Sequence, residues 1–134
     1  MLPVDDDDGR LAQRERNTMP VVNLDQKLAT FTEHWSPKVV ESFNGHDIMV
    51  VKVQGEFVWH AHANTDDLFL VLKGRLTIQL RDRDVDLGPG DLYVVPKGVE
   101  HRPVAEQETH LLLIEPHDTP NTGDPATATA KEAI

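Results

Sequence analysis

Short runs of alternating apolar and polar residues fill the chain between residues 38 and 115. The run RLTIQLR is the cleanest, because Leu76, Ile78 and Leu80 share one strand face while polar side chains occupy the other. Other runs with the composition of strands are KVVESF, IMVVKV, EFVWHAH, DLFLVLK, DVDL, DLYVVP, HRPVA and HLLLIE. Short strands that follow one another without intervening helices predict an all-β fold, an antiparallel sandwich or barrel.

A short helix is predicted ahead of the strands. Asn23 is a residue type that caps the start of helices, and Pro37 ends the pattern. Between them four apolar residues recur at helical spacing, namely Leu24, Leu28, Phe31 and Trp35. The sequence therefore predicts a short N-terminal helix that packs on the outside of the barrel.

The two ends of the chain lack this patterning. Residues 1–18 contain four consecutive aspartates and few apolar residues, so we expect a disordered acidic segment there. Residues 116–134 contain three prolines and no apolar periodicity, and are expected to form a disordered C-terminal tail. The folded domain is then residues 19–115, and either Met1 or Met19 can be the natural start.

Composition narrows the function classes. A net charge of −10 repels phosphate backbones and anionic lipids, so the sequence predicts a small-molecule partner, with no nucleic acid and no membrane. The absence of cysteine excludes disulfides, thiolate zinc sites and cysteine nucleophiles. The chain starts with an acidic run where a secretory signal needs a basic region, so we expect a cytoplasmic protein.

One strand run indicates self-association. DLFLVLK is apolar on both strand faces, whereas the barrel interior covers only one of them. The other face requires the helix, a second sheet or a partner subunit to cover it. We interpret this as an indication of a homodimer.

Two stretches carry the candidate chemistry. His60 and His62 are two residues apart in the predicted strand EFVWHAH, so both imidazoles should face one side at a separation that one metal ion bridges. Asp67 begins the next predicted strand and can return a carboxylate to the same place. In the second stretch, Pro96 and the glycine after Lys97 suit a turn that steers His101 back into the barrel.

These stretches resemble the two signature motifs of the cupin superfamily, G-x5-H-x-H-x3,4-E-x6-G and G-x5-P-x-G-x2-H-x3-N, and in particular its small single-domain bacterial type with the cupin 2 conserved barrel. The resemblance covers residues 55–105, and the second motif matches through Gly90, Pro96, Gly98 and His101. Three positions depart from the motifs. Only four residues separate Gly55 from His60, Ala105 stands where asparagine is frequent, and Asp67 replaces glutamate.

The resemblance implies an antiparallel double-stranded β-helix, or jelly-roll, barrel that holds one divalent metal ion on His60, His62, Asp67 and His101. Sites with nitrogen and oxygen ligands suit Fe, Mn, Ni, Zn or Cu, and the sequence does not choose among them. The aspartate is shorter than glutamate by one methylene. Direct ligation, ligation through a water and a role as hydrogen-bond acceptor therefore all stay open for Asp67.

The function implied by the resemblance is that of a metal-dependent oxidoreductase or isomerase, of dioxygenase or isomerase type, acting on a small oxygen-rich organic molecule. The alternative is a non-catalytic cupin that binds or senses a small ligand. Trp59 and Phe69 are the candidates for a substrate pocket, with a place in the core as the competing interpretation. Arg102 is interpreted as a solvated arginine, and His110 as an edge histidine rather than a proton-transfer group. The remaining histidines, His34, His46 and His117, are expected at the surface.

Overall fold

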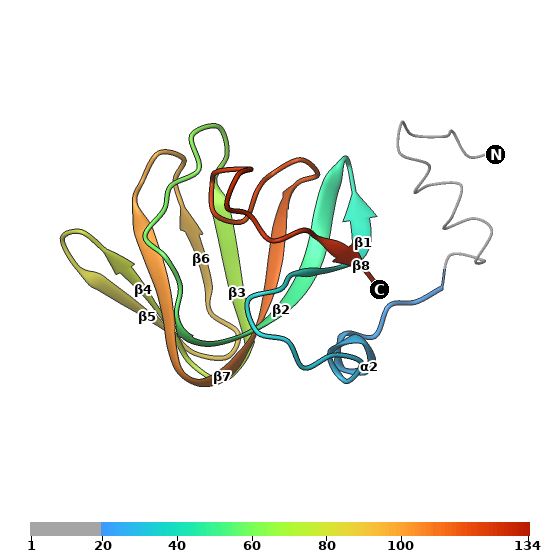
Figure 1. Cartoon of the computed structure of the whole chain (residues 1–134). Coiled ribbons are helices and arrows are strands. Elements are labelled where there is room, and N and C mark those ends of the chain that lie inside the picture. Colours follow the sequence, from blue (N-terminus) through green and yellow to red (C-terminus); the bar gives the residue numbers. More distant parts are fainter. Residues whose placement is uncertain (1–19) are drawn as a thin grey trace.

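The computed structural model describes residues 20–134, so the disorder expected for residues 1–18 lies outside the described part of the chain (Figure 1). The elements are α2 (Leu24–Leu28), β1 (Lys38–Phe43), β2 (His46–Glu56), β3 (Asp67–Lys73), β4 (Leu76–Leu80), β5 (Asp84–Leu87), β6 (Leu92–Val95), β7 (His101–Pro116) and β8 (Glu132–Ala133). Within residues 20–134 no helix has the length and apolar character that crossing a membrane requires.

The strands curl into one barrel around β7 (Figure 1). The sheet order is β5-β4-β7-β2-β1-β8, while β3 pairs with both β6 and β7. The start of β7 pairs with β4, as in His101 opposite Leu80, and its later half pairs with β2, as in Leu112 opposite Val50. A long strand that changes partners along its length closes the sheet on itself, which confirms the predicted jelly-roll barrel.

The barrel interior is filled by the alternate residues of these strands. In β4, Leu76, Ile78 and Leu80 are buried while the two residues between them are half-buried, as the alternation predicts. They join an interior cluster with Val51, Val53, Phe69, Val71, Leu87, Val95, Ala105 and Leu111. Burial of each large aliphatic or aromatic side chain contributes about 1.5–3 kcal/mol, so this cluster is the main source of stability.

The predicted helix exists but is shorter than expected. Asn23 caps it by accepting a hydrogen bond from Gln26 N at 2.9 Å, and the helix ends at Leu28. Extension through Phe31 to Trp35 was wrong, because the chain there bonds to β2 instead. The Lys52 ammonium donates to Phe31 O at 2.7 Å, and Trp35 N donates to Lys52 O at 2.8 Å.

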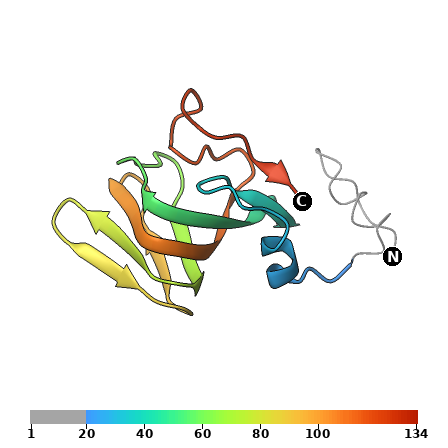
Figure 2. The same cartoon turned by 60° about the horizontal axis from the view of Figure 1, so that its bottom comes forward.

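The helix packs outside the barrel, as predicted (Figure 2). Leu28 and Phe31 form a second apolar cluster with Val40 of β1 and Val50 of β2. Leu72 of β3 also packs against this cluster, so the helix covers part of the outer face of the run DLFLVLK.

Three of the predicted strands differ in the structure. EFVWHAH is largely a loop after Glu56, in which only His60 forms an isolated bridge, with His101. HRPVA and HLLLIE form one continuous strand, β7. The polar residues between them, Glu106, Gln107 and Glu108, are exposed, and the pairing of β7 with β2 shifts its register there, between Val53 and Gly55.

The C-terminal stretch also departs from the sequence-based expectation of a disordered tail. Figure 1 shows it in red, crossing one end of the barrel before β8 pairs in parallel with β1. Thr119 is buried, and Ile134 packs against the helix cluster. The segment lacks apolar periodicity because its course depends on backbone and ionic contacts, chiefly those of Lys131 with buried carboxylates.

Candidate metal centre and ligand cavity

The four predicted metal ligands come from two elements and one loop. His60 and His62 lie in the loop between β2 and β3, Asp67 is the first residue of β3, and His101 is the first residue of β7. The backbones of His60 and His101 bond to each other in both directions, with N–O distances of 3.1 and 2.9 Å. This bridge brings the two motifs together although 41 positions separate the residues in the sequence.

The side chains converge on one carboxylate oxygen. Oδ2 of Asp67 lies 2.9 Å from Nε2 of His101, 3.2 Å from Nε2 of His62 and 4.0 Å from Nε2 of His60. The ligand atoms of all four residues lie within 4.8 Å of one another. All four side chains are at least nine-tenths buried. The cluster is therefore a buried set of three imidazoles and one carboxylate that can hold a metal ion.

The second nitrogen of two of these rings shows that the donor set suits a cation. Nδ1 of His60 lies 2.9 Å from Val58 O, and Nδ1 of His101 lies 2.9 Å from Val99 O. In a neutral imidazole, donation from Nδ1 leaves the lone pair on Nε2, and both Nε2 atoms face the carboxylate. Lone pairs and a carboxylate oxygen that converge repel one another unless a proton or a metal ion lies among them. Without a metal ion, a proton on Nε2 of His101 bonds to Asp67 instead, and in either case the site favours a positive charge.

His62 is held differently. Its Nδ1 is buried and has no hydrogen-bond partner among the described residues. The orientation of this ring is therefore set by its Nε2 contact with Asp67 and by the packing of its loop. Gly98 N, from the turn of the second motif, donates to His62 O at 2.8 Å and ties the loop down.

The protonation of the cluster also suits a metal ion. Burial, together with repulsion from His101 and His62, lowers the pKa of His60 to about 4. Burial alone would raise the pKa of Asp67, but the hydrogen bonds of His101 and His62 outweigh it and lower that pKa. At neutral pH, His60 is therefore a neutral imidazole and Asp67 an ionised carboxylate, which are the forms that bind metals.

Asp67 acts in the opposite direction on His62. Burial would lower the pKa of His62, but the hydrogen bond and the charge of Asp67 raise it. The carboxylate thus attracts positive charge into the cluster, whether that charge is a proton on His62 or a bound cation.

A cavity adjoins the cluster. Its volume is about 480 Å³ with its open mouth included. Its polar lining comprises His60, His62, Asp67, Glu115 and Asn121, and its aromatic lining comprises Trp35, Phe57 and Phe69. The remaining lining residues are aliphatic or proline. The cavity therefore has a polar end at the cluster and apolar walls, as is usual for small-molecule sites.

The two predicted pocket residues differ in outcome. Phe69 lines the cavity, but Trp59 does not. The Trp59 ring lies outside it, 3.8 Å from the Arg81 guanidinium and 5.5 Å from that of Arg102. Trp59 precedes His60 directly, and because neighbouring side chains in extended backbone face opposite sides, a ring next to an inward ligand faces out.

Several residues of the cavity were not among the predicted pocket residues Trp59 and Phe69. Trp35 stacks on Phe57 with ring centroids 4.9 Å apart, and both line the wall. Glu115 follows Leu111 and Leu113 on the inward face of β7, so the strand period could have found it. Asn121 had no signal at all, because it lies in the stretch expected to be a tail.

The other polar candidates lie outside the cluster. Arg102 binds Gln79 and Glu56. Glu108 accepts hydrogen bonds from His110 at 3.0 Å and from His34 at 2.9 Å. The His117 side chain is half exposed, as expected for a surface histidine, and its Nδ1 lies 3.1 Å from the fully buried carboxylate of Asp47.

Comparison with known proteins agrees with this geometry. Residues 47–117 match the family described as Cupin domain. The crystal structure of a cupin-2 domain containing protein from Shewanella frigidimarina is 47% identical, with 72% of this chain and 95% of that one covered and a TM-score of 0.72. A Neisseria meningitidis protein of known structure is 33% identical, with 72% and 98% covered and a TM-score of 0.66. The uncharacterized protein YdbB of Bacillus subtilis is 30% identical over 102 residues, which are 75% of this chain and 84% of YdbB. As the two histidine motifs led us to expect, the chain belongs to the cupin family.

Proposed function

We propose that the chain is a metal-dependent enzyme of dioxygenase or isomerase type that acts on a small oxygen-bearing organic molecule. The observation that carries this proposal is the buried set of three imidazoles and one carboxylate at the polar end of an apolar cavity. A divalent ion, Fe, Mn, Ni, Zn or Cu, supplies Lewis-acid chemistry toward a substrate oxygen there or, if it is iron, oxygen activation.

Each residue of the cluster has a role in this proposal. His60, His62 and His101 hold the ion through Nε2, and the carbonyl groups of Val58 and Val99 orient the first and third of these rings. Asp67 supplies the negative charge that offsets part of the charge of the ion. The metal affinities of the variants Asp67→Asn and Asp67→Glu distinguish direct ligation by Asp67 from hydrogen-bond acceptance.

The walls of the cavity select the body of the substrate. Trp35, Phe57 and Phe69 present ring surfaces, which favour flat and largely apolar molecules.

Metal analysis followed by turnover assays tests the proposal. The purified protein should retain one divalent ion per chain after dialysis, His60→Ala should lose it, and the matched control His110→Ala should keep it. A panel of phenolic and keto-enol compounds should then give oxygen consumption or isomerisation. A protein that binds no metal, or a His60→Ala variant that keeps it, would contradict the proposal, and tight binding without turnover would favour the non-catalytic alternative.

A homodimer in the cytoplasm is part of the same proposal. On the outer face of the sheet, Leu70 pairs with Leu92 and Leu68 with Val94, and Leu92 and Val94 are 59% and 42% exposed. A second copy would cover these residues, which α2 does not reach. Light scattering should give the dimer mass for the natural chain and the monomer mass for Leu92→Asp, while cell fractionation tests the location.

A further inference from the structure

Residues 118–134, which we name the strap, lie beyond residues 47–117 that match the cupin family. The strap crosses the barrel at the end where the loop of His60 and His62 lies (Figure 1). A second hollow between them is lined by His62 and its neighbours on one side and by Thr119 and Pro120 on the other. The strap is therefore an addition of this chain beside the metal site.

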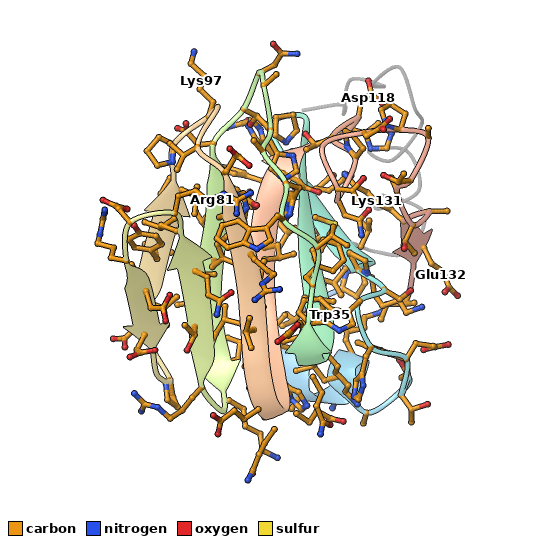
Figure 3. All side chains as sticks on the ribbon, turned by 60° about the vertical axis from the view of Figure 1, so that its left-hand side comes forward. Trp35, Arg81, Lys97, Asp118, Lys131 and Glu132 are labelled. Carbon is orange, nitrogen blue, oxygen red and sulfur yellow. The ribbon has the colours of Figure 1, made fainter. Side chains whose placement is uncertain are left out.

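Ionic contacts fix the position of the strap. The Lys131 ammonium lies 3.2 Å from Oδ2 of Asp47 and 3.2 Å from Oε1 of Glu115, and both carboxylates are buried. Glu132 binds the buried Lys38 at 2.6 Å, where β8 pairs with β1. Figure 3 shows Asp118, Lys131 and Glu132 following one another along one side of the molecule. A segment held at these points has a defined course over the cavity.

The strap also contacts the ligand loop directly. Gly123 has a positive φ of 77°, and a side chain at this position would collide with the carbonyl oxygen of Ala61, between the two histidines. Glycine therefore permits the close approach of strap and loop. This approach brings Asn121, two residues earlier, to the cavity that His60 and His62 also line.

The amide of Asn121 has one end committed and one end available. Its Oδ1 accepts a hydrogen bond from Thr129 N at 2.9 Å, within the strap. Because a backbone N–H can bond only to the amide oxygen, this contact identifies Oδ1 and therefore also Nδ2. The Nδ2 group is a donor without a partner among the described residues. Because Asn121 lines the cavity, a ligand that fills it and excludes water should carry an oxygen that accepts from this donor, since an unpaired donor is costly there.

We propose that Asn121 is a specificity-determining residue that donates a hydrogen bond from Nδ2 to an oxygen acceptor of the substrate. The substrate class is then a flat, largely apolar molecule with one oxygen group for the metal and a second, accepting oxygen away from it. This inference rests on the proposed function only for the contact between the metal ion and the first substrate oxygen.

Two matched probes test it, 4-hydroxybenzaldehyde, which has a second oxygen acceptor, and 4-methylphenol, which lacks one. Binding is measured by calorimetry on the full chain, both metal-free and loaded with zinc. Asn121→Asp keeps the oxygen that accepts from Thr129 but replaces the donor, and Asn121→Ala removes the donor without adding charge. Either variant should weaken binding of the aldehyde roughly tenfold, as expected for a lost hydrogen bond, and leave 4-methylphenol within about twofold.

The control Ala126→Asp places the same charge at an exposed position of the strap and should bind both probes like the natural chain. Equal losses for both probes would show that Asn121 only shapes the strap, and unchanged binding of the aldehyde, or no binding by the natural chain, would overturn the inference. Zinc affinity, measured in parallel, should not change in either variant. If the natural chain binds no metal but still discriminates between the probes through Asn121, the proposed function fails and this inference stands.

Discussion

Two buried polar clusters lie near the cavity, and they differ in the source of their positive charge. In the first, Asp67 faces three imidazoles, of which His60 is neutral at physiological pH. In the second, Asp47 and Glu115 lie opposite each other on β2 and β7, and the Lys131 ammonium binds both. The second cluster contains its own cation, the Lys131 ammonium, which holds the C-terminal segment to β2 and β7. Among the described residues, no lysine or arginine forms an ion pair with Asp67, and this difference indicates which cluster can hold a metal ion.

The largest effect is expected for Lys131→Met, which tests whether the second cluster depends on its ammonium for stability. The variant removes the ammonium that binds both buried carboxylates, while His117 still contacts Asp47, and it should lower the free energy of unfolding by about 3–5 kcal/mol. Urea denaturation measures it, with the exposed Lys97→Met as matched control. Adding Asp47→Asn to Lys131→Met should restore part of the loss. Equal stability of the two lysine variants would show that the contacts of Lys131 with Asp47 and Glu115 do not stabilise the fold.

A smaller effect is expected at the first cluster, from Asp67. Asp67→Asn removes the charge but keeps the shape, and should weaken metal affinity roughly 10–100-fold. Asp67→Glu restores the residue that is usual in the family motif and keeps the charge. If Asp67 ligates directly, the longer glutamate should bind metal at least as well as aspartate in competition titrations with a chelator. Natural affinity in Asp67→Asn would remove the carboxylate from the metal site.

The smallest effect concerns pH and Glu115. Burial raises the pKa of Glu115 to about 6, against the ordinary 4.5, although Lys131 opposes this. The folded state therefore holds a proton that the unfolded chain has released, so this contribution is fully present below pH 4.5 and is lost as the pH rises through 6. As the pH rises through this window, the free energy of unfolding of the metal-free natural chain should fall by on the order of 1–2 kcal/mol relative to that of Glu115→Gln.

Urea denaturation of both chains at several pH values measures the difference, and the exposed Glu106→Gln supplies the matched control. If the free energy of unfolding of the natural chain rises with pH relative to that of Glu115→Gln, the pKa of Glu115 is not raised. This result would mean that Lys131 outweighs burial and that Glu115 is ionised throughout.

The barrel and the cluster of three imidazoles and one carboxylate could be predicted because their signals act over short distances in the chain. The alternation in RLTIQLR determines which residues of β4 are buried, whatever the rest of the chain does. The spacing of His60 and His62, and the turn before His101, place these residues on predictable sides of the backbone. The prediction of a strand through His62 was wrong, yet the convergence held because the bridge of His60 with His101 keeps that part extended.

The helix shows where such local reasoning stops. Leu24, Leu28, Phe31 and Trp35 have helical spacing, but Lys52 offers its ammonium and its carbonyl oxygen to the chain after the first two of them. Bonds to β2 replace those that a longer helix would form, and Trp35 consequently enters the cavity wall. Tertiary partners override a helical pattern where the intrinsic preference is weak.

By itself, the sequence determined the fold class, the four residues of the buried cluster and Phe69 of the cavity, because periodicity, turn residues and ligand spacing act within a few positions. Only the tertiary structure decided that Trp59 faces outward, that Asn121 reaches the cavity, and that Lys131 lies between two carboxylates. The contact of Lys131 with Asp47 spans 84 positions. No local pattern encodes such a pairing, because it depends on where the folded barrel leaves buried charge that a distant side chain can neutralise.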